Sequence, residues 1–276
     1  MIKKLKEIDF RGKGQSKRLG KQHELAGGPK GIFGKNAQIH DASAYDVSKK
    51  IYDFLKKKYS NLNFRHRTNI PKKEINFKLK SIDNKLGEVL FVKDASIKPD
   101  GGIIEVKDSS DNWRIILIGE SKHQGNDIEK IVAGVKQGKN KDQDLMTAGN
   151  AIERVHKNIL EFRNLMLDEI HFPYVVFFQG SNFATETFFI KDIKIAHDSG
   201  GLNRIDRTTS SSYSMKINKN YCKNIFIKLK NNSQMLQVPS MYYQCESWTE
   251  EKMRKIMLKT VVTSIKILTG SLPKLK

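Results

Sequence analysis

Two apolar runs joined by a short polar segment constrain the fold of this chain more than any other feature of its sequence. The runs cover residues 103–107 and 113–119, and the five residues between them are Asp, Ser, Ser, Asp and Asn. Short polar side chains of this kind favour turns because they bond to nearby backbone groups. The segment therefore predicts two antiparallel strands joined by a turn. A further apolar run at residues 174–178, directly after Pro173, indicates a buried strand.

Helical periodicity flanks these strands. Residues 43–59 place Val47, Ile51, Phe54 and Leu55 on one helical face, and Ser43 or Asp41 precedes them as a cap. The other elements that we expect are a strand at residues 88–92, a long helix at 144–167, and a last helix that ends at 268 and begins at a capping box of Ser247 and Glu250. Strands that alternate with helices predict an α/β fold.

The length of the chain indicates how many domains it forms, and its charge indicates what kind of partner it binds. The 276 residues suit one domain with small appendages, and 38% hydrophobic residues can form a core. The net charge of +20 implies a polyanionic partner. Nucleic acid is favoured over an acidic membrane surface, because no amphipathic lipid-binding helix stands out. We expect residues 1–30 to form a flexible basic arm, with a plain disordered tail as the alternative, and residues 31–276 to form a single domain.

The cysteines and the N-terminus indicate the cellular compartment. Cys222 and Cys245 are the only cysteines, and they show neither a metal-ligand spacing nor a disulfide framework. No apolar run follows the first charged residues, so a signal peptide is not expected. No segment has the apolar length of a membrane span. These features predict a cytoplasmic protein without a membrane partner.

The expected hairpin gathers charged groups at its open end. A turn centred on Ser110 pairs residues whose numbers sum to 220, which sets Asp100 opposite Glu120. Paired residues point to the same side of a sheet, and Lys122 shares that side because it lies two residues further on. The same register predicts an apolar floor below them, made of Ile104, Val106, Ile116 and Ile118.

Two carboxylates at this distance repel each other unless a cation lies between them. Mg²⁺ takes oxygen ligands and needs only one or two carboxylates, so Asp100, Glu120 and Lys122 predict a catalytic metal site. The alternative is a surface ladder of salt bridges. Glu-x-Lys also occurs by chance, at residues 105–107 and 250–252, and we expect Glu105 to project from the opposite face of the sheet.

Several ordered blocks of the chain resemble the EcoRI-type restriction endonucleases of the PD-(D/E)xK superfamily. The resemblance spans roughly residues 15 to 270. Its main blocks are residues 96–103, 120–125 and 143–154, and shorter ones lie at 31–34, 171–174, 180–183 and 202–207. The resemblance implies a mixed β-sheet flanked by helices, and a homodimer astride a palindromic DNA site. It also implies that Asp100 and Glu120 bind Mg²⁺ with help from the Ser121 carbonyl, and that Lys122 is the catalytic lysine.

The resemblance further implies residues that recognise the DNA bases. Asn150 is expected to read adenine and Arg204 to read guanine, as the hydrogen-bonding groups of these side chains allow. The other expected members of this set are Met146, Thr147, Gly149, Ala151, Glu153, Arg154 and Arg207. The implied target is GAATTC, cut after the G to leave 5′ AATT overhangs, with an adenine methyltransferase in the same cell. Thr147 and Ser121 stand where the family has alanine, and Thr147 leaves the stringency of recognition open.

Basic residues outside these blocks are expected to contact the DNA backbone. Arg65 and Arg67 are the candidates, together with the N-terminal arm. Two other interpretations of the chain remain at this point. One is a repair nuclease that recognises DNA structure rather than sequence, and the other is a basic nucleic-acid-binding protein without enzymatic activity.

Overall fold

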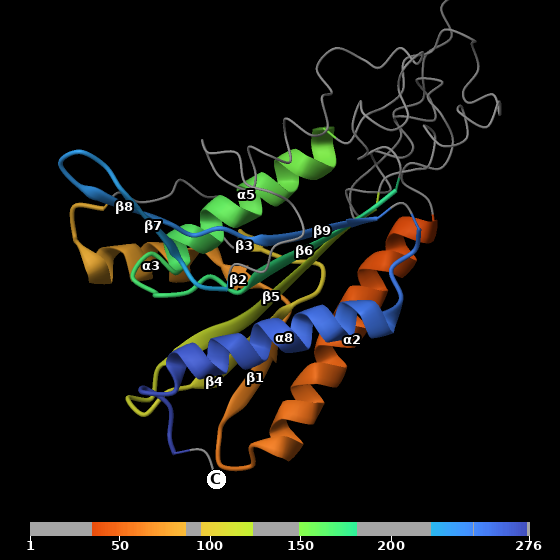
Figure 1. The fold of residues 1–276 in the computed structure, drawn as a ribbon, viewed down its shortest axis with the longest axis horizontal. Helices are drawn as coiled ribbons and strands as arrows, with labels where there is room; N and C mark the ends of the chain where they lie inside the picture. Colours follow the sequence, from red (N-terminus) through yellow and green to blue (C-terminus); the bar gives the residue numbers. More distant parts are fainter. Residues whose placement is uncertain (1–34, 87–94, 124–148, 181–221, 245, 275–276) are drawn as a thin grey trace, which may run out of the picture.

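A five-stranded mixed sheet forms the centre of the molecule (Figure 1). The computed structural model describes residues 35–86, 95–123, 149–180, 222–244 and 246–274. The first three strands in the sheet order run antiparallel, and the last three run parallel to one another. In that order the strands are β1 (Phe64–Arg67), β4 (Ile103–Lys107), β5 (Trp113–His123), β6 (Tyr174–Gln179) and β9 (Ser240–Gln244).

Helices cover both faces of this sheet and enclose two separate cores. The helices α2 (Lys35–Lys58) and α8 (Glu250–Leu268) pack on one face, where they bury an apolar cluster with Val106 and Phe177. The helices α3 (Lys72–Ile82) and α5 (Gly149–Leu165) pack on the other face. The α/β fold class predicted from the sequence is therefore confirmed.

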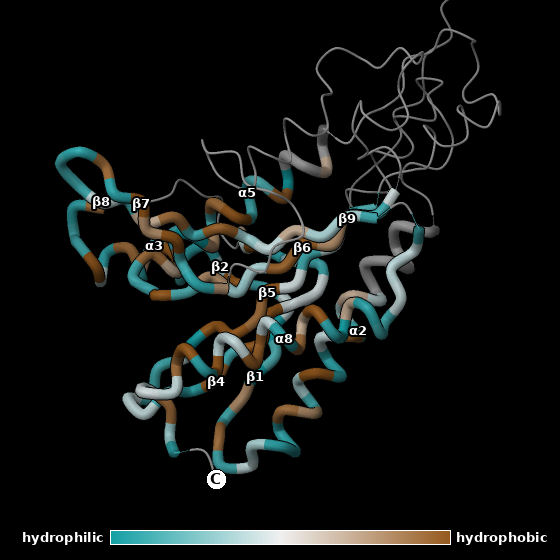
Figure 2. The backbone as a smooth tube through the Cα atoms, in the orientation of Figure 1, coloured by the Kyte–Doolittle hydropathy of each residue, from teal (hydrophilic) through white to brown (hydrophobic). Residues whose placement is uncertain are grey.

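Two short strand pairs lie outside the central sheet. The strands β2 (Ile70–Pro71) and β3 (Ser96–Ile97) pair with each other, and β7 (Ile225–Lys228) and β8 (Ser233–Leu236) form a hairpin. Figure 2 shows brown, hydrophobic residues concentrated on the central strands, while the loop between β7 and β8 is teal. The hydrophobic stabilisation thus comes mainly from the two layers beside the central sheet.

Most of the predicted elements are present. The runs at 103–107 and 174–178 are strands, and the run from 113 continues as a strand to His123. Asp108 accepts hydrogen bonds from the backbone N–H groups of Ser110 and Asn112, which explains the turn between the first two strands. The helix predicted at 43–59 begins earlier, at Lys35, and ends at Lys58.

Other predictions are wrong or lie outside the described residues. The last helix ends at Leu268 as predicted, but its cap is Thr249, whose hydroxyl accepts from the backbone of Lys252 at 3.3 Å, rather than the Ser247 box. The predicted arm, the strand at 88–92 and the first residues of the helix predicted at 144–167 are not among the described residues. Within the described ranges, no helix has the length and apolarity needed to cross a membrane.

A β-bulge corrects the predicted hairpin register. Glu105, Val106 and Lys107 pair with residues whose numbers complete a sum of 220, as predicted. Between Ile104 and Glu105 the register shifts by one, because Ile116 is an extra residue in β5. From there on Ile104 pairs with Leu117 and Ile103 with Ile118, and Asp100 lies in the turn before β4, so the predicted ladder pairing of residues 100 and 120 is wrong.

The bulge also divides the predicted apolar floor between the two cores. Ile104, Val106 and Ile116 belong to the core beneath α2 and α8. Ile118 belongs to the core on the α3 and α5 side. The prediction of one continuous floor on a single face is therefore wrong. Glu120, two residues after Ile118 on β5, lies on the α5 side of the sheet.

Candidate active site

The candidate site lies where β5 passes the turn that precedes β4. Gly102 closes this turn by donating its N–H to the Pro99 carbonyl at 3.1 Å, with φ at +71°, a conformation that glycine adopts without strain. Gly101 donates to the Gly119 carbonyl at 2.8 Å. A Cβ at Gly101 would lie 2.9 Å from the carbonyl carbon of Gly119, so the two backbones approach at a distance that a side chain would prevent. This approach brings Asp100 next to Glu120.

Lys122 joins the predicted groups into one cluster. Its ammonium group contacts carboxylate oxygens of both Asp100 and Glu120, and it donates to the Ser121 carbonyl oxygen at 3.0 Å. The structure thus brings together the catalytic and metal-binding candidates that the sequence identified, despite the shift in register. The three oxygen-bearing groups converge on a single cation.

Glu120 is the most buried charged residue of this cluster, with a side chain only 1% exposed against 13% for Lys122 and 25% for Asp100. Two residues that sequence reasoning did not identify contact its carboxylate. The Tyr174 hydroxyl donates to Oε2 at 3.0 Å, and the Asn158 amide nitrogen lies 3.3 Å from Oε2 and 3.4 Å from Oε1. A tyrosine at the start of a fully buried strand was the available signal, because a buried hydroxyl group needs a hydrogen-bond partner.

Burial and charge act in opposite directions on this cluster. Burial raises the pKa of Glu120 to about 7, the nearby Asp100 carboxylate adds to the rise, and the Lys122 charge opposes it. Burial lowers the pKa of Lys122, but attraction to Glu120 and Asp100 outweighs it, so this pKa lies above its usual range. The ammonium group therefore keeps its proton at neutral pH, and it shares its charge between two carboxylates.

The donor set of the cluster fits a hard divalent cation. Asp100, Glu120 and the Ser121 carbonyl offer oxygen atoms, which Mg²⁺ prefers, and water completes such a shell. Among the described residues there is no group of three or more His, Cys, Asp or Glu side chains able to hold a metal. A zinc site of the tetrahedral kind is thus not formed within those ranges, whereas two carboxylates and a carbonyl suffice for Mg²⁺.

The predicted base-reading residues are described only in part. Met146, Thr147, Arg204 and Arg207 lie outside the described residues. Gly149, Asn150 and Glu153 belong to the first turns of α5, where the structure describes the helix but not these side chains. The remaining two are Ala151, which is partly buried against the core, and Arg154, which is half-buried. Their roles in base recognition stay predictions.

Arg65 and Arg67, the predicted contacts to the DNA backbone, form ion pairs within the protein. Arg65 makes a bidentate ion pair with Glu105, with one contact at 3.0 Å. Arg67 makes a bidentate ion pair with Glu74, with contacts at 2.7 and 2.9 Å. Both guanidinium groups thus already have carboxylate partners. This arrangement favours a structural role over the predicted phosphate contact.

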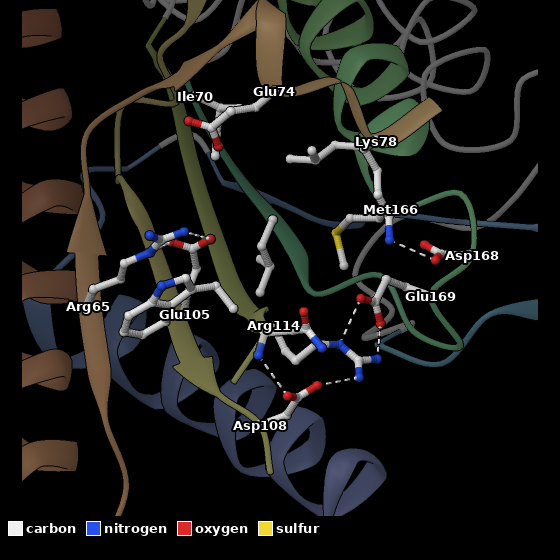
Figure 3. Close-up of a pocket in the computed structure, with 14 residues that line it drawn as sticks. Arg65, Ile70, Glu74, Lys78, Glu105, Asp108, Arg114, Met166, Asp168 and Glu169 are labelled. Carbon is white, nitrogen blue, oxygen red and sulfur yellow. Dashed lines mark hydrogen bonds and ion pairs between the residues drawn. The ribbon is translucent and has the colours of Figure 1, made fainter. Parts of the chain in front are cut away.

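A cavity of about 420 Å³ lies at the far end of β5 from this cluster (Figure 3). Arg114 reaches across it to Asp108 and Glu169, and Arg65 lines another wall with Glu105. Neither Asp100 nor Glu120 nor Lys122 lines this cavity. The cavity therefore lies away from the predicted metal ligands, and the cluster on β5 remains the candidate for chemistry.

Comparisons with known proteins identify the family of this chain. The family model described as "Restriction endonuclease EcoRI" matches residues 26–274. The chain is 56% identical over 271 residues to the type II restriction enzyme RsrI of Cereibacter sphaeroides, which covers 96% of this chain and 98% of that protein. It is 49% identical over 263 residues to the type II restriction enzyme EcoRI of Escherichia coli, covering 93% and 95% of the two chains. The chain therefore belongs to the EcoRI family of restriction endonucleases.

Proposed function

We propose that this restriction endonuclease uses Mg²⁺ to hydrolyse both strands of DNA at GAATTC, cutting after the G to leave 5′ AATT overhangs. The observation that carries the proposal is the convergence of Asp100, Glu120 and the Ser121 carbonyl on the Lys122 ammonium group. The two similar restriction enzymes, RsrI and EcoRI, support the choice of reaction class. The target sequence rests on the resemblance of the recognition blocks.

The residues of the cluster take distinct roles in this proposal. Asp100, Glu120 and the Ser121 carbonyl would hold Mg²⁺, which when bound polarises a phosphoryl oxygen and lowers the pKa of a bound water. Lys122 stabilises negative charge that develops on the phosphate, because its raised pKa keeps the ammonium group protonated.

The proposed assembly is a homodimer on double-stranded DNA. A two-fold symmetric dimer presents the same surface to each half of a palindrome, so two clusters can cut the two strands at equivalent positions. Asn150 and Arg204 are the proposed readers of adenine and guanine. We further propose that the enzyme acts in the cytoplasm, alongside an adenine methyltransferase that protects the cell's own sites.

Digestion of a plasmid of known sequence tests the proposal directly. With Mg²⁺, the fragments are expected to end at GAATTC sites with four-nucleotide 5′ overhangs, and sequencing of the fragment ends measures this. Ends without a fixed sequence would instead support a nuclease that recognises DNA structure. Binding without any Mg²⁺-dependent cleavage would support a DNA-binding protein without catalytic activity.

A further inference from the structure

The Tyr174 hydroxyl reaches Glu120 from the neighbouring strand. β5 and β6 run parallel, with Ile118 paired to Tyr174 and Glu120 paired to Val176. Paired residues of adjacent strands point to the same face, so Tyr174 and Glu120 share the face that α5 covers. Because Glu120 lies two residues beyond the partner of Tyr174 along the strands, the long tyrosine side chain spans the gap to the carboxylate at 3.0 Å.

The ring of Tyr174 is held firmly in place. It is fully buried, meets Phe162 edge-on with centroids 5.6 Å apart, and stacks on Phe172 at 5.7 Å. Phe162 lies on α5, and Phe172 lies just before β6. Packing on both sides leaves the ring little freedom, so the direction of its hydroxyl is set by the core rather than by the carboxylate.

The two oxygens of Glu120 have different partners. Oε1 contacts the Lys122 ammonium group beside Asp100, whereas Oε2 accepts the Tyr174 hydroxyl. Asn158, from α5, approaches both oxygens at longer distance. The terminal torsion of a glutamate is otherwise broad, so a donor fixed on one oxygen determines where the other oxygen points.

We infer that Tyr174, assisted by Asn158, is a positioning residue that orients Glu120 so that Oε1 serves as the metal-binding oxygen. The inference rests on the proposed function, since it assigns a role toward the Mg²⁺ that Glu120 is proposed to bind. A partner that orients a ligand in this way tunes metal affinity without touching the metal or the DNA. A merely structural hydroxyl would instead affect only the stability of the fold.

The test compares metal binding in Tyr174→Phe with that in the full-length wild-type enzyme. Phenylalanine keeps the packed ring and removes only the hydroxyl. Mn²⁺ takes the same oxygen ligands as Mg²⁺, and electron paramagnetic resonance measures the Mn²⁺ that remains free, with and without a GAATTC duplex. We expect Tyr174→Phe to weaken Mn²⁺ binding by about tenfold and to raise the half-saturating Mg²⁺ concentration for cleavage by a similar factor. High Mg²⁺ is expected to restore most of the rate.

Tyr242→Phe is the matched control. Tyr242 is half-buried on β9 and stacks on Phe177 in the core on the other face of the sheet. Its substitution removes a hydroxyl from the same sheet without touching Glu120, so metal binding is expected to stay at the wild-type level. If Tyr174→Phe and Tyr242→Phe leave Mn²⁺ affinity equally unchanged, the positioning role is wrong. Asn158→Ala is expected to act in the same direction with a smaller effect, because its contacts are longer.

A Glu120→Gln background separates this inference from the proposed function. Once Glu120 no longer binds metal as a carboxylate, adding Tyr174→Phe is expected to change Mn²⁺ affinity no further. A further loss in the double variant would mean that Tyr174 acts elsewhere, which overturns the inference alone. Wild-type Mn²⁺ affinity and cleavage in Glu120→Gln itself would overturn the proposed metal site instead.

Discussion

Two Glu-x-Lys segments lie on adjacent strands of this sheet, and the structure gives them opposite surroundings. In the segment on β4, Glu105 is 3% exposed and takes the fork of Arg65, while Lys107 pairs with Asp111 at 2.6 Å. In the segment on β5, Glu120 is equally buried, but it shares the single ammonium group of Lys122 with Asp100. Glu105 and Asp111 thus each have a cation of their own, whereas Asp100 and Glu120 share one.

The difference lies in the balance of charge and not in the motif. A buried carboxylate that is matched by a guanidinium fork needs no further cation. Two carboxylates that share one ammonium group leave an excess negative charge, which a divalent cation can neutralise. The number of cations beside the buried carboxylates thus differs between two segments that share the pattern Glu-x-Lys.

The largest expected effect comes from replacing the two buried glutamates by glutamine. Glu120→Gln removes a charged ligand and is expected to lower the cleavage rate by at least about 100-fold while sequence-specific DNA binding persists. Glu105→Gln is expected to leave the rate nearly unchanged. Cleavage of a GAATTC duplex and binding by fluorescence anisotropy measure the two outcomes. Equal loss of cleavage in both variants would remove the distinction between the segments.

A second, smaller effect concerns the stability that the two ion pairs of the β4 segment contribute. Arg65→Ala leaves Glu105 buried with its main cation gone, and it is expected to lower the free energy of unfolding by about 2–3 kcal/mol. Lys107→Ala removes a cation from a pair whose Asp111 side chain is 82% exposed, and it is expected to cost less than about 1 kcal/mol. Urea denaturation measures both values.

The salt dependence of DNA binding then decides whether Arg65 also holds a phosphate. Loss of one phosphate contact reduces the slope of log K against log salt by about 0.9, so the proposed homodimer, which carries Arg65 twice, would lose about 1.8. Since Arg65 pairs with Glu105 in the structure, we expect its substitution to leave the slope unchanged. A reduction of that size would restore the DNA-backbone role predicted from the sequence.

The sequence predicted the hairpin well but not its bulge, for a physical reason. Asp108 and the polar residues after it have a turn chemistry that can be read locally, whereas residues 115–118 are all buried and apolar. Where both faces of a strand are covered, periodicity carries no information on register. The charged cluster formed nevertheless, because the long, flexible side chain of Lys122 tolerates a displacement of one residue.

The partners of Glu120 could not be predicted in the same way. Tyr174 and Asn158 come from segments 54 and 38 residues away, and only the parallel pairing of β5 with β6 and the packing of α5 bring them together. Charge patterning identifies groups that repel each other, but it does not identify neutral donors. The helix α3 was missed because few of its side chains are buried, namely Ile75, Asn76 and Leu79.

A histidine supports the turn at the end of β4 nearest Asp100, in contrast to the Arg65–Glu105 ion pair further along the strand. His66 pairs with Ile104 in the sheet, and a Cβ on Gly102 would lie 2.8 Å from its Nε2 atom, so the ring packs directly against the turn that follows Asp100. The Nε2 atom lies 2.8 Å from the Ser48 hydroxyl. Burial lowers the pKa of His66 to about 4, with a further decrease from Lys49 that Asp53 partly opposes.

This neutral support predicts that acid lowers the stability of the protein. A lowered histidine pKa means that the unfolded chain binds the proton first, so stability is full above about pH 6.5 and falls as the pH drops toward 4. Allowing for solvent screening of the partly exposed ring, the loss in the free energy of unfolding is on the order of 1–2 kcal/mol.

His66→Phe keeps a ring that does not titrate, and urea unfolding of wild type and variant at pH 7 and pH 4.5 measures the effect. Burial also lowers the pKa of His123 and His171, but they contribute equally to both proteins, so the difference between wild type and variant isolates His66. Identical pH dependence in the two proteins would show that the ring is already solvated.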